Sequence, residues 1–387
     1  MSYHFQTVKH LVHGAGCLDE LPQRLALLDT EVKRLVLVTQ DAMHRLGVTQ
    51  RVTELFNAIG ISVHLVDQVE IEPTLENIER VFREQIAPHA PDALLAIGGG
   101  SVLDAAKLFS VLLTNDVPLR SMLGIDNVPR AGIPTVLVPT TAGTGSEVTP
   151  NAIVTLPDEA LKIGVVSRHL LPTLVLLDPL LTLSLPGPIT AATGMDAFTH
   201  ALESFISTKA NPVSDGFALE SMRLIAGSLV ESYERPDSVR ARADMLLGSM
   251  YGGLALTAAG TAAVHALAYP LGGQFHVTHG VANAMLLPHV MRFNQDACAE
   301  RLKRAACVCA IAREEDSTDQ AASQLVAQIV EWTRRLQIPQ DLRAYGVEDR
   351  HVAELAVAAS KVTRLMVNNP KAMSLADIEA VYRCLLP

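Results

Sequence analysis

A regular alternation in the first half of this 387-residue chain constrains its fold more than any other feature. Short, continuously apolar runs alternate with longer stretches in which apolar residues recur at helical spacing. A strand that is apolar at every position is buried on both faces, which is typical of parallel sheets covered by helices. The pattern therefore predicts βα units around a parallel sheet. The apolar runs are 34–40, 62–67, 92–98, 135–140 and 174–178, and the helical stretches are 43–59, 74–86 and 101–113.

The pattern changes after the segment Leu183-Ser-Leu-Pro-Gly-Pro188. From there on, strand-like runs almost vanish and helical periodicity dominates. A boundary at about 185 divides the chain into an α/β domain, residues 1–185, and an all-helical domain, residues 186–387. The chain length suits two or three domains, and 49% hydrophobic residues supply their cores. The helical stretches are 191–206, 212–233, 238–258 and most of 295–336.

Charge and composition exclude several classes of protein. The net charge is −10 and no basic stripe is present, whereas nucleic-acid binding needs clustered Lys and Arg to neutralise phosphates. No uncharged apolar run is long enough to span a membrane, and the N-terminal residues lack a signal-peptide pattern. Five irregularly spaced cysteines are typical of reduced thiols. We therefore expect a soluble, cytoplasmic protein that binds neither nucleic acid nor membrane.

A glycine-rich loop follows the third apolar run and precedes a helix. It consists of Gly98, Gly99, Gly100 and Ser101. Glycines let the backbone approach a ligand closely, and a helix N-terminus offers free N–H groups to a phosphate. The alternative is a tight turn with Ser101 as the N-cap of the helix. Asp104, on that helix, is a candidate cofactor contact or a capping or surface residue.

A second polar loop, residues 139–147, follows the fourth apolar run. Its hydroxyl groups suit hydrogen bonds to the phosphate, ribose or carboxamide of a cofactor, although a polar turn is the simpler alternative. Ligands bind at the carboxyl ends of parallel strands, so two such loops in one sheet indicate a cofactor site more strongly than either does alone. The candidate residues of this loop are Thr140, Thr141, Thr144 and Ser146.

A third constellation has the residue types of a metal site. Asp196 and His200 are four residues apart on a predicted helix and therefore lie on one face. His265 and His279 follow downstream. One carboxylate and three imidazoles suit Fe(II) or Zn(II). A single histidine of this kind is more often a structural residue, and two others are near enough to be rival ligands: His276 and His289.

Four segments together resemble the iron-containing (group III) alcohol dehydrogenases. The resemblance extends from about Phe5 to Leu386, and it implies a dehydroquinate synthase-like fold with a dinucleotide-binding domain and a helical metal-binding domain. It also implies hydride transfer between NAD or NADP and a small alcohol or aldehyde, with the metal polarising the substrate oxygen, in a homodimer or larger homo-oligomer. The segments are GGGS at 98–101, PTTAGTGSE at 139–147, GMDAFTHALE at 194–203 and HALAYPLGGQFHVTHGVANAMLLPHV at 265–290.

The resemblance also implies roles for single residues. Asn151 and Leu256 become candidate substrate contacts, Lys162 matches a lysine near the cofactor, and His265 is counted as catalytic because it holds the metal at the reacting centre. The matched metal ligands are Asp196, His200, His265 and His279. The matched cofactor residues are those of the loop at 98–101 together with Thr140, Thr141 and Thr144.

The chain departs from the family pattern at two positions. Many members carry a second histidine four residues after the third ligand, where this chain has Tyr269. A tyrosine hydroxyl, with an ordinary pKa of about 10, is a weaker proton relay than histidine near neutral pH, so Tyr269 is a catalytic candidate with an altered proton route. Many NAD-preferring members carry an aspartate where this chain has Gln40, followed by Asp41. NADP is therefore not excluded.

Several alternatives stay open. Within the same superfamily they are a maleylacetate reductase-like enzyme, a glycerol dehydrogenase and a hydroxyacid dehydrogenase, for example of 4-hydroxybutyrate. The intact ligand set counts against a metal-free reductase. A lyase like dehydroquinate synthase would need a second basic cluster for a phosphorylated sugar acid, which the sequence lacks. A scaffold protein would need neither the two loops nor the four ligands.

Overall fold

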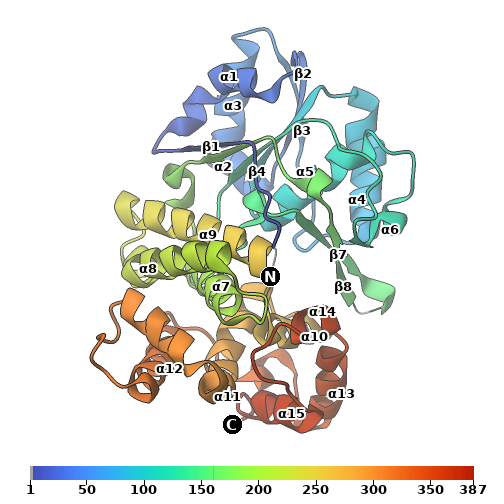
Figure 1. The fold of residues 1–387 in the computed structure, drawn as a ribbon. Helices are drawn as coiled ribbons and strands as arrows, with labels where there is room; N and C mark the ends of the chain where they lie inside the picture. Colours follow the sequence, from blue (N-terminus) through green and yellow to red (C-terminus); the bar gives the residue numbers. More distant parts are fainter. Residues whose placement is uncertain (1–2, 160) are drawn as a thin grey trace. The chain divides into compact units, whose positions relative to one another are not determined.

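The computed structural model describes residues 3–159 and 161–387, and its chain packs into two compact units. The α/β unit comprises Gln6–Thr141 and Ser146–Leu183. The helical unit comprises Ser184–Pro387, the loop Ala142–Gly145 and the segment that ends at Phe5. In Figure 1 the α/β unit runs from blue to green and most of the helical unit from yellow-green to red.

A parallel sheet forms the centre of the α/β unit, as predicted, and it has a sixth strand, β1, that was not predicted. Its strand order is β1-β9-β6-β4-β2-β3, and every neighbouring pair is parallel. β4 and β9 are buried along their whole length. The strands are β1 (His10–His13), β2 (Arg34–Val38), β3 (Ser62–Val66), β4 (Ala93–Gly98), β6 (Thr135–Pro139) and β9 (Leu174–Leu177).

Helices cover both faces of this sheet, which explains why its central strands are almost continuously apolar, whereas the edge strands β1 and β3 contain polar residues. Alternate residues of β2 enter separate cores: Val36 packs with α4 and α5, whereas Leu37 packs with α3. The strands β2, β3, β4 and β6 each contribute to two hydrophobic clusters in this way. The helices are α1 (Leu21–Arg24), α2 (Asp41–Arg45), α3 (Val48–Asn57), α4 (Leu75–Val81), α5 (Gly100–Leu112) and α6 (Leu119–Met122).

Further details of the α/β unit differ from the sequence prediction. The helix expected at 43–59 is broken into α2 and α3 at Gly47, whose φ of 72° lies in the left-handed region. The helix expected at 74–86 is α-helical only to Val81 and continues as a π-helical turn. A second sheet was not predicted, and it consists of β5 (Gly124–Ile125), β7 (Asn151–Leu156) and β8 (Leu161–Val166).

The helical unit is built around α7, which is buried over most of its length and packs against α8, α9 and α11. Among its described residues it contains no strand, as predicted. The stretch expected to be helical at 295–336 belongs to two helices, α11 and α12. The helices are α7 (Gly187–Ile206), α8 (Pro212–Glu234), α9 (Val239–Ala259), α10 (Ala263–Phe275), α11 (His279–Val308), α12 (Thr318–Arg335), α13 (Asp349–Ser360), α14 (Thr363–Met366) and α15 (Leu375–Arg383).

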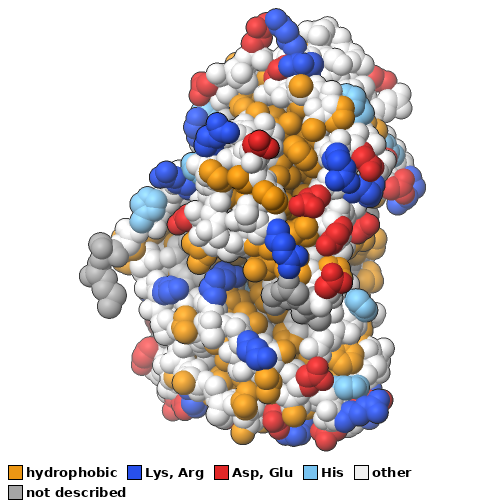
Figure 2. Space-filling view, turned by 90° about the vertical axis from the view of Figure 1, so that its right-hand side faces the viewer, with side chains coloured by type: hydrophobic (Ala, Val, Ile, Leu, Met, Phe, Trp, Pro, Cys, Tyr) orange, Lys and Arg blue, Asp and Glu red, His pale blue; other side chains and the backbone are white. Residues whose placement is uncertain are grey.

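In the described part of the chain, no single helix has both the length and the apolar character of a membrane span, although the bent pair α9 and α10 meets both criteria together. Figure 2 shows acidic and basic side chains interspersed on one face of the molecule, without a broad basic area on that face.

Candidate metal centre

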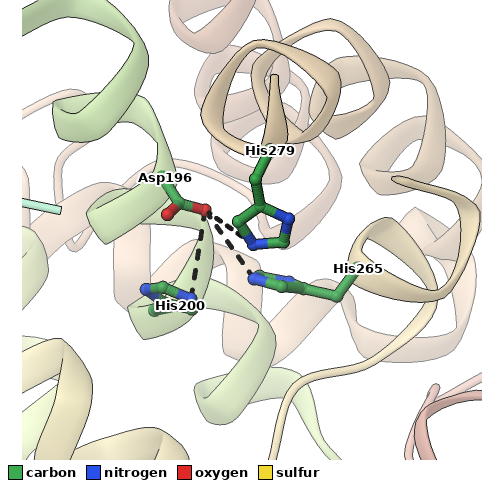
Figure 3. A group of neighbouring side chains, drawn as sticks. All are labelled: Asp196, His200, His265 and His279. Atoms are coloured by element: carbon green, nitrogen blue, oxygen red, sulfur yellow. Dashed lines mark ion pairs between the residues drawn. The ribbon is translucent and has the colours of Figure 1, made fainter. Parts of the chain in front are cut away.

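Four side chains of the helical unit converge on one point (Figure 3). Asp196 and His200 come from the middle of α7, His265 from the first turn of α10, and His279 is the first residue of α11. The distances from Asp196 Oδ1 to the three Nε2 atoms are 3.9 Å for His200, 3.8 Å for His265 and 3.7 Å for His279. All four candidate ligand atoms lie within 4.8 Å of one another. The structure therefore brings together the four residues that the sequence singled out.

Local packing brings the helices that carry these residues close together. The four-residue spacing places Asp196 and His200 on one face of α7. At the start of α11, Gly280 lies against that helix: a Cβ there would stand 2.7 Å from the carbonyl oxygen of Ala192. A side chain at position 280 would push α11 away, so this glycine permits the approach that carries His279 to the cluster.

The burial of the cluster fits a bound cation. Asp196 and His265 are only 2% and 3% exposed, and His265 Nε2 has no hydrogen-bond partner among the described residues. Leaving such a buried group unsatisfied costs about 1–3 kcal/mol. Four ligands placed about 2.1 Å from one ion stand roughly 3–4 Å apart, which is close to the separations from Asp196 Oδ1. The donor set and its spacing therefore suit Fe(II) or Zn(II).

Glu203, which the sequence analysis did not single out, orients His265. Its buried carboxylate accepts hydrogen bonds from His265 Nδ1 at 2.6 Å, from the backbone N–H of Ala262 at 3.0 Å and from that of Val264 at 2.6 Å. The proton of His265 is thereby held on Nδ1, which leaves the Nε2 lone pair for a metal. The sequence offered one signal for Glu203: it lies two turns after Asp196 in the same predicted helix.

Two more contacts complete the surroundings of the cluster. His200 Nδ1 donates to the carbonyl oxygen of Gly143 at 3.2 Å, which again leaves Nε2 for a metal. Asn283, one turn after His279 on α11, donates from Nδ2 to Asp196 Oδ1 at 2.7 Å. Its Nδ2 also lies 3.1 Å from His279 Nε2. Asn283 was likewise missed from the sequence, where only its four-residue spacing from His279 pointed to it.

The electrostatics of the cluster favour the protonation states of metal ligands. Burial raises the pKa of Asp196, but the nearby His200, His279 and His265, together with the Asn283 hydrogen bond, outweigh it and bring this pKa below its ordinary value. Burial lowers the pKa of His200, against the opposing effect of Asp196. An ionised carboxylate beside a neutral imidazole is the state in which both groups bind a metal.

Tyr269 lies beside this cluster. It follows His265 by one turn of α10, and its ring centroid is 6.1 Å from that of His279. Burial raises the pKa of Tyr269, while the positive charge of Arg364 opposes that rise. The phenol is therefore protonated near neutral pH. Arg364 was not singled out from the sequence, and only its position in space connects it to the site.

The remaining candidates of the helical unit lie outside the cluster. His276 is exposed at the C-terminus of α10 in a left-handed conformation, with φ 55°. His289 lies further along α11 and does not belong to the group of four. Neither rival histidine therefore joins the convergent set. Leu256 is half-buried on α9.

In the α/β unit, the glycine-rich loop joins β4 to α5. A Cβ on Gly98 would lie 2.7–2.9 Å from three side-chain carbons of Val102, so the turn requires glycine there. Gly99 occupies the N-cap position without a side-chain cap. The predicted alternative role of Ser101 as N-cap is therefore wrong: Ser101 lies inside the helix, and its hydroxyl accepts from the N–H of Glu72 at 3.0 Å. Helix α5 begins at Gly100, so the backbone N–H groups of its first turn come directly after Gly99.

The second loop begins beside the first. Thr140 follows β6, is buried, and donates its N–H to the carbonyl oxygen of Gly98 at 3.0 Å. A Cβ on Gly99 would lie 3.6 Å from Thr141 Cγ2. The carboxyl ends of β4 and β6 thus carry both loops together. Thr144 belongs to the segment Ala142–Gly145, which packs with the helical unit.

Other predicted cofactor residues bond within the α/β unit. Asp104 accepts from the hydroxyl of Ser146 and from the N–H of Ile153 at 3.0 Å. Lys162 pairs with Glu72 at 2.6 Å. These side chains shape the region around the loops. Two further candidates lie next to the ends of strands. Gln40 lies between β2 and α2, at the N-cap of α2. Asn151 is the first residue of β7, and its carbonyl oxygen accepts a hydrogen bond from Lys107 Nζ at 2.5 Å.

Comparisons with known proteins agree with this architecture. Residues 9–179 match the family described as iron-containing alcohol dehydrogenase, and residues 190–386 match the C-terminal domain of the Fe-containing alcohol dehydrogenase family. Long-chain-alcohol dehydrogenase 1 of Geobacillus thermodenitrificans is 37% identical over 98% of this chain and 95% of its own length.

Solved structures give the same result. A crystal structure of 1,3-propanediol oxidoreductase has a TM-score of 0.94 at 33% identity, covering 100% of both chains. Sulfoacetaldehyde reductase from Bifidobacterium kashiwanohense, solved in complex with NAD+, has a TM-score of 0.88 at 26% identity and covers 100% of this chain and 99% of its own. This chain therefore belongs to the iron-containing alcohol dehydrogenase family and is an oxidoreductase that interconverts alcohols and aldehydes.

Proposed function

We propose that this protein is an NAD(P)-dependent alcohol dehydrogenase whose helical unit holds Fe(II) or Zn(II) through Asp196, His200, His265 and His279. One observation carries the assignment of the metal. His265 Nε2 is buried and lacks a hydrogen-bond partner among the described residues, and it faces three further ligand atoms (Figure 3). When bound, such an ion supplies a Lewis acid that polarises the substrate oxygen.

The protein prepares this centre through its own hydrogen bonds. Glu203 holds the proton of His265 on Nδ1, and the carbonyl of Gly143 does the same for His200. Asn283 fixes the Asp196 carboxylate. Because these partners set the ring orientations before any ligand arrives, little reorganisation accompanies the reaction. The protonated hydroxyl of Tyr269 serves as a hydrogen-bond donor at the centre, in place of the histidine found in many members of the family.

We propose further that residues 1–185 form the dinucleotide-binding domain and residues 186–387 the metal-binding domain. The glycine loop at the end of β4 and the first turn of α5 support this role, because helix N-termini with exposed N–H groups bind phosphates. Thr140 and Thr141 extend the loop from the neighbouring strand. The neighbour solved with NAD+ supports a nicotinamide dinucleotide. Gln40 carries no charge to repel the 2′-phosphate of NADP, so we propose that either dinucleotide is accepted.

The substrates are proposed to be small alcohols and aldehydes, with Asn151 and Leu256 as contacts. Two structural neighbours, named for 1,3-propanediol and sulfoacetaldehyde, support short polar chains, whereas the Geobacillus relative is named for long-chain alcohols. We place the enzyme in the cytoplasm, where its five free cysteines stay reduced. The resemblance of the sequence to the family supports a homodimer or larger homo-oligomer.

Metal removal tests the proposal directly. The purified protein is stripped with a chelator, and Fe(II) or Zn(II) is restored to separate portions without oxygen. Oxidation of NADH and NADPH is then followed with neutral short aldehydes. We expect activity to return only with metal in the wild type, and equally in the control His276→Asn, which preserves the left-handed backbone of a histidine outside the cluster. Full activity of the stripped protein would contradict the proposal.

A further inference from the structure

A buried lysine of the α/β unit has no part in the function proposed above. Lys107 lies on α5, two turns after the glycine loop, and its side chain has no exposed surface. Its Nζ atom lies 3.1 Å from Asp104 Oδ1 and 2.5 Å from the carbonyl oxygen of Asn151. It also lies 3.3 Å from the carbonyl oxygen of Thr149 and 3.4 Å from its hydroxyl oxygen. Acceptor oxygens of the protein thus take the place of water around this ammonium group.

Asp104 extends the contacts of Lys107 to two more residues. Its carboxylate accepts hydrogen bonds from the hydroxyl of Ser146 and, at 3.0 Å, from the backbone N–H of Ile153. Asp104 and Lys107 are three residues apart on α5, so their side chains lie on one face of that helix. This face packs against β7 (Figure 1). The pair therefore attaches the segment 146–153 to α5 at both ends and between them.

The two elements that the pair joins are each continuous with a candidate cofactor loop. Helix α5 begins at Gly100 of the glycine loop, and Ser146 belongs to the second polar loop. The hydrogen bond from Thr140 N–H to the carbonyl oxygen of Gly98 connects the loops at their start. The contacts of Lys107 connect them again further on, which fixes the position of one loop relative to the other. They also fix the backbone of Asn151, the candidate substrate contact.

A buried ion pair does more to fix geometry than to stabilise a fold. The desolvation of two charges commonly cancels their attraction, and apolar side chains of the same size often stabilise a protein as well or better. An ammonium group differs from an apolar one because its three N–H donors bind particular oxygen atoms. We therefore expect the contacts of Lys107 to define where the segment 146–153 lies.

We propose that Lys107 is a positioning residue for dinucleotide binding, because it holds the end of the second polar loop and the start of β7 against α5. The inference rests on the proposed function and adds to that site a residue two turns inside the helix. Lys107 acts through Asp104 and through backbone carbonyls, so it takes no part in the chemical step.

The substitution Lys107→Met tests the proposal, since it keeps the length of the side chain and removes its donors. NADH affinity of the metal-loaded protein is measured by fluorescence quenching, and the melting temperature by circular dichroism. We expect NADH to bind about 10-fold more weakly, because the buried oxygens that lose Nζ find new partners only if the segment shifts. The matched control is Phe109→Leu on the same helix, where the ring is buried and stacks on Phe82. It should lower the melting temperature and keep the wild-type NADH affinity.

A lysine with a merely structural role would give a different result. Both variants would then melt earlier and bind NADH as the wild type does, which would overturn the proposal. Thr149→Val is the second variant, in case Lys107→Met does not fold. It removes one acceptor of Nζ at nearly constant volume, and we expect NADH affinity to fall about threefold. Wild-type affinity in Thr149→Val would count against the proposal in the same way.

Amide hydrogen exchange separates this inference from the proposed function, because it requires neither dinucleotide nor turnover. In the metal-loaded protein we expect the amides of residues 146–153 to exchange at least about 10-fold faster in Lys107→Met than in the wild type. In Phe109→Leu this segment should exchange as in the wild type. If the wild type binds no NADH, the proposed function fails, while faster exchange in Lys107→Met still shows that the lysine holds this segment. Equal exchange in the two proteins would refute the inference.

Discussion

In the helical unit, the candidate ligands come from three helices and their donor atoms all lie within 4.8 Å of one another. Further buried side chains, Glu203 and Asn283, orient them. In the α/β unit, the glycine loop and Thr140 follow the ends of strands, and the side chains of Asp104 on α5 and Lys162 in β8 bond to their own unit. One region thus offers side-chain atoms to a ligand, while the other offers a loop whose shape depends on glycines. Substitutions should therefore act on the two regions through different mechanisms.

The substitution His265→Ala is expected to have the largest effect, and to affect the metal centre without affecting dinucleotide binding. It removes a buried ligand atom of the helical unit and leaves the loops of the α/β unit unchanged. We expect turnover to fall at least about 1000-fold, because several kcal/mol of transition-state stabilisation are lost with the metal. Dinucleotide affinity, followed by quenching of NADH fluorescence, should stay within a factor of about three. Retention of more than a few per cent of wild-type turnover would contradict the assignment of His265.

The pKa values of two buried carboxylates, one in each unit, are shifted in opposite directions. Histidines hold the pKa of Asp196 down, whereas burial raises the pKa of Glu147 in the α/β unit to about 7, with Lys107 opposing. A carboxyl whose folded pKa exceeds its ordinary value of 4.5 stabilises the fold fully below that value, and the contribution is lost as pH rises toward 7.

Glu147→Gln should therefore flatten the decline in the free energy of unfolding between about pH 4.5 and pH 7. The expected difference is up to about 3 kcal/mol, measured by urea denaturation at a series of pH values. Glu31→Gln, at an exposed position in the same unit, serves as the control and should leave the decline unchanged. An identical pH dependence in Glu147→Gln and the wild type would show that Glu147 is ionised in the fold throughout this range.

A more moderate effect is expected where a side chain orients a ligand without being one. In Glu203→Gln, the amide cannot accept all three hydrogen bonds of the carboxylate, so His265 loses its fixed tautomer. We expect metal affinity to fall about 10- to 100-fold, measured by competition with a chromogenic chelator. Glu220→Gln, at a half-buried position of α8 where the carboxylate pairs with Arg223, should keep the wild-type affinity. Equal affinities in all three proteins would reduce Glu203 to a packing residue.

The smallest effect tests the loop of the α/β unit. In Gly98→Ala, the new Cβ meets Val102 at 2.7–2.9 Å, and the strain of about 1–3 kcal/mol displaces the turn. We expect dinucleotide affinity to fall about 10-fold while the metal content stays that of the wild type. Gly14→Ala, where a Cβ would meet no atom within 4 Å, is the matched control. A loss of metal instead of dinucleotide affinity would reverse the division of roles between the units.

Local patterns in the sequence predicted most of the sheet, and they failed where longer-range contacts override them. The strand β7 was missed because Ile153 is apolar yet only half-buried, which hides the alternation of a strand with one buried face. The break at Gly47 was missed because the apolar spacing continues through it into α3. Both errors arise from the same cause: periodicity records which face is buried, and the partner that buries it is absent from the local sequence.

The residues of the candidate site also fall into those that local sequence patterns identify and those that only the packed structure identifies. The pair Asp196 and His200 could be identified from the sequence because a helix places residues four apart on one face, whatever surrounds it. From the residue types alone, His279 could not be distinguished from its rivals His276 and His289, and only the family resemblance selected it. The structure reaches the same choice independently, because α7 packs against α10 and α11, which lie more than 50 residues further along the chain. Glu203 and Asn283 were identified from the structure alone. Their roles depend on which atoms lie within hydrogen-bonding distance, and only the packed chain defines those distances.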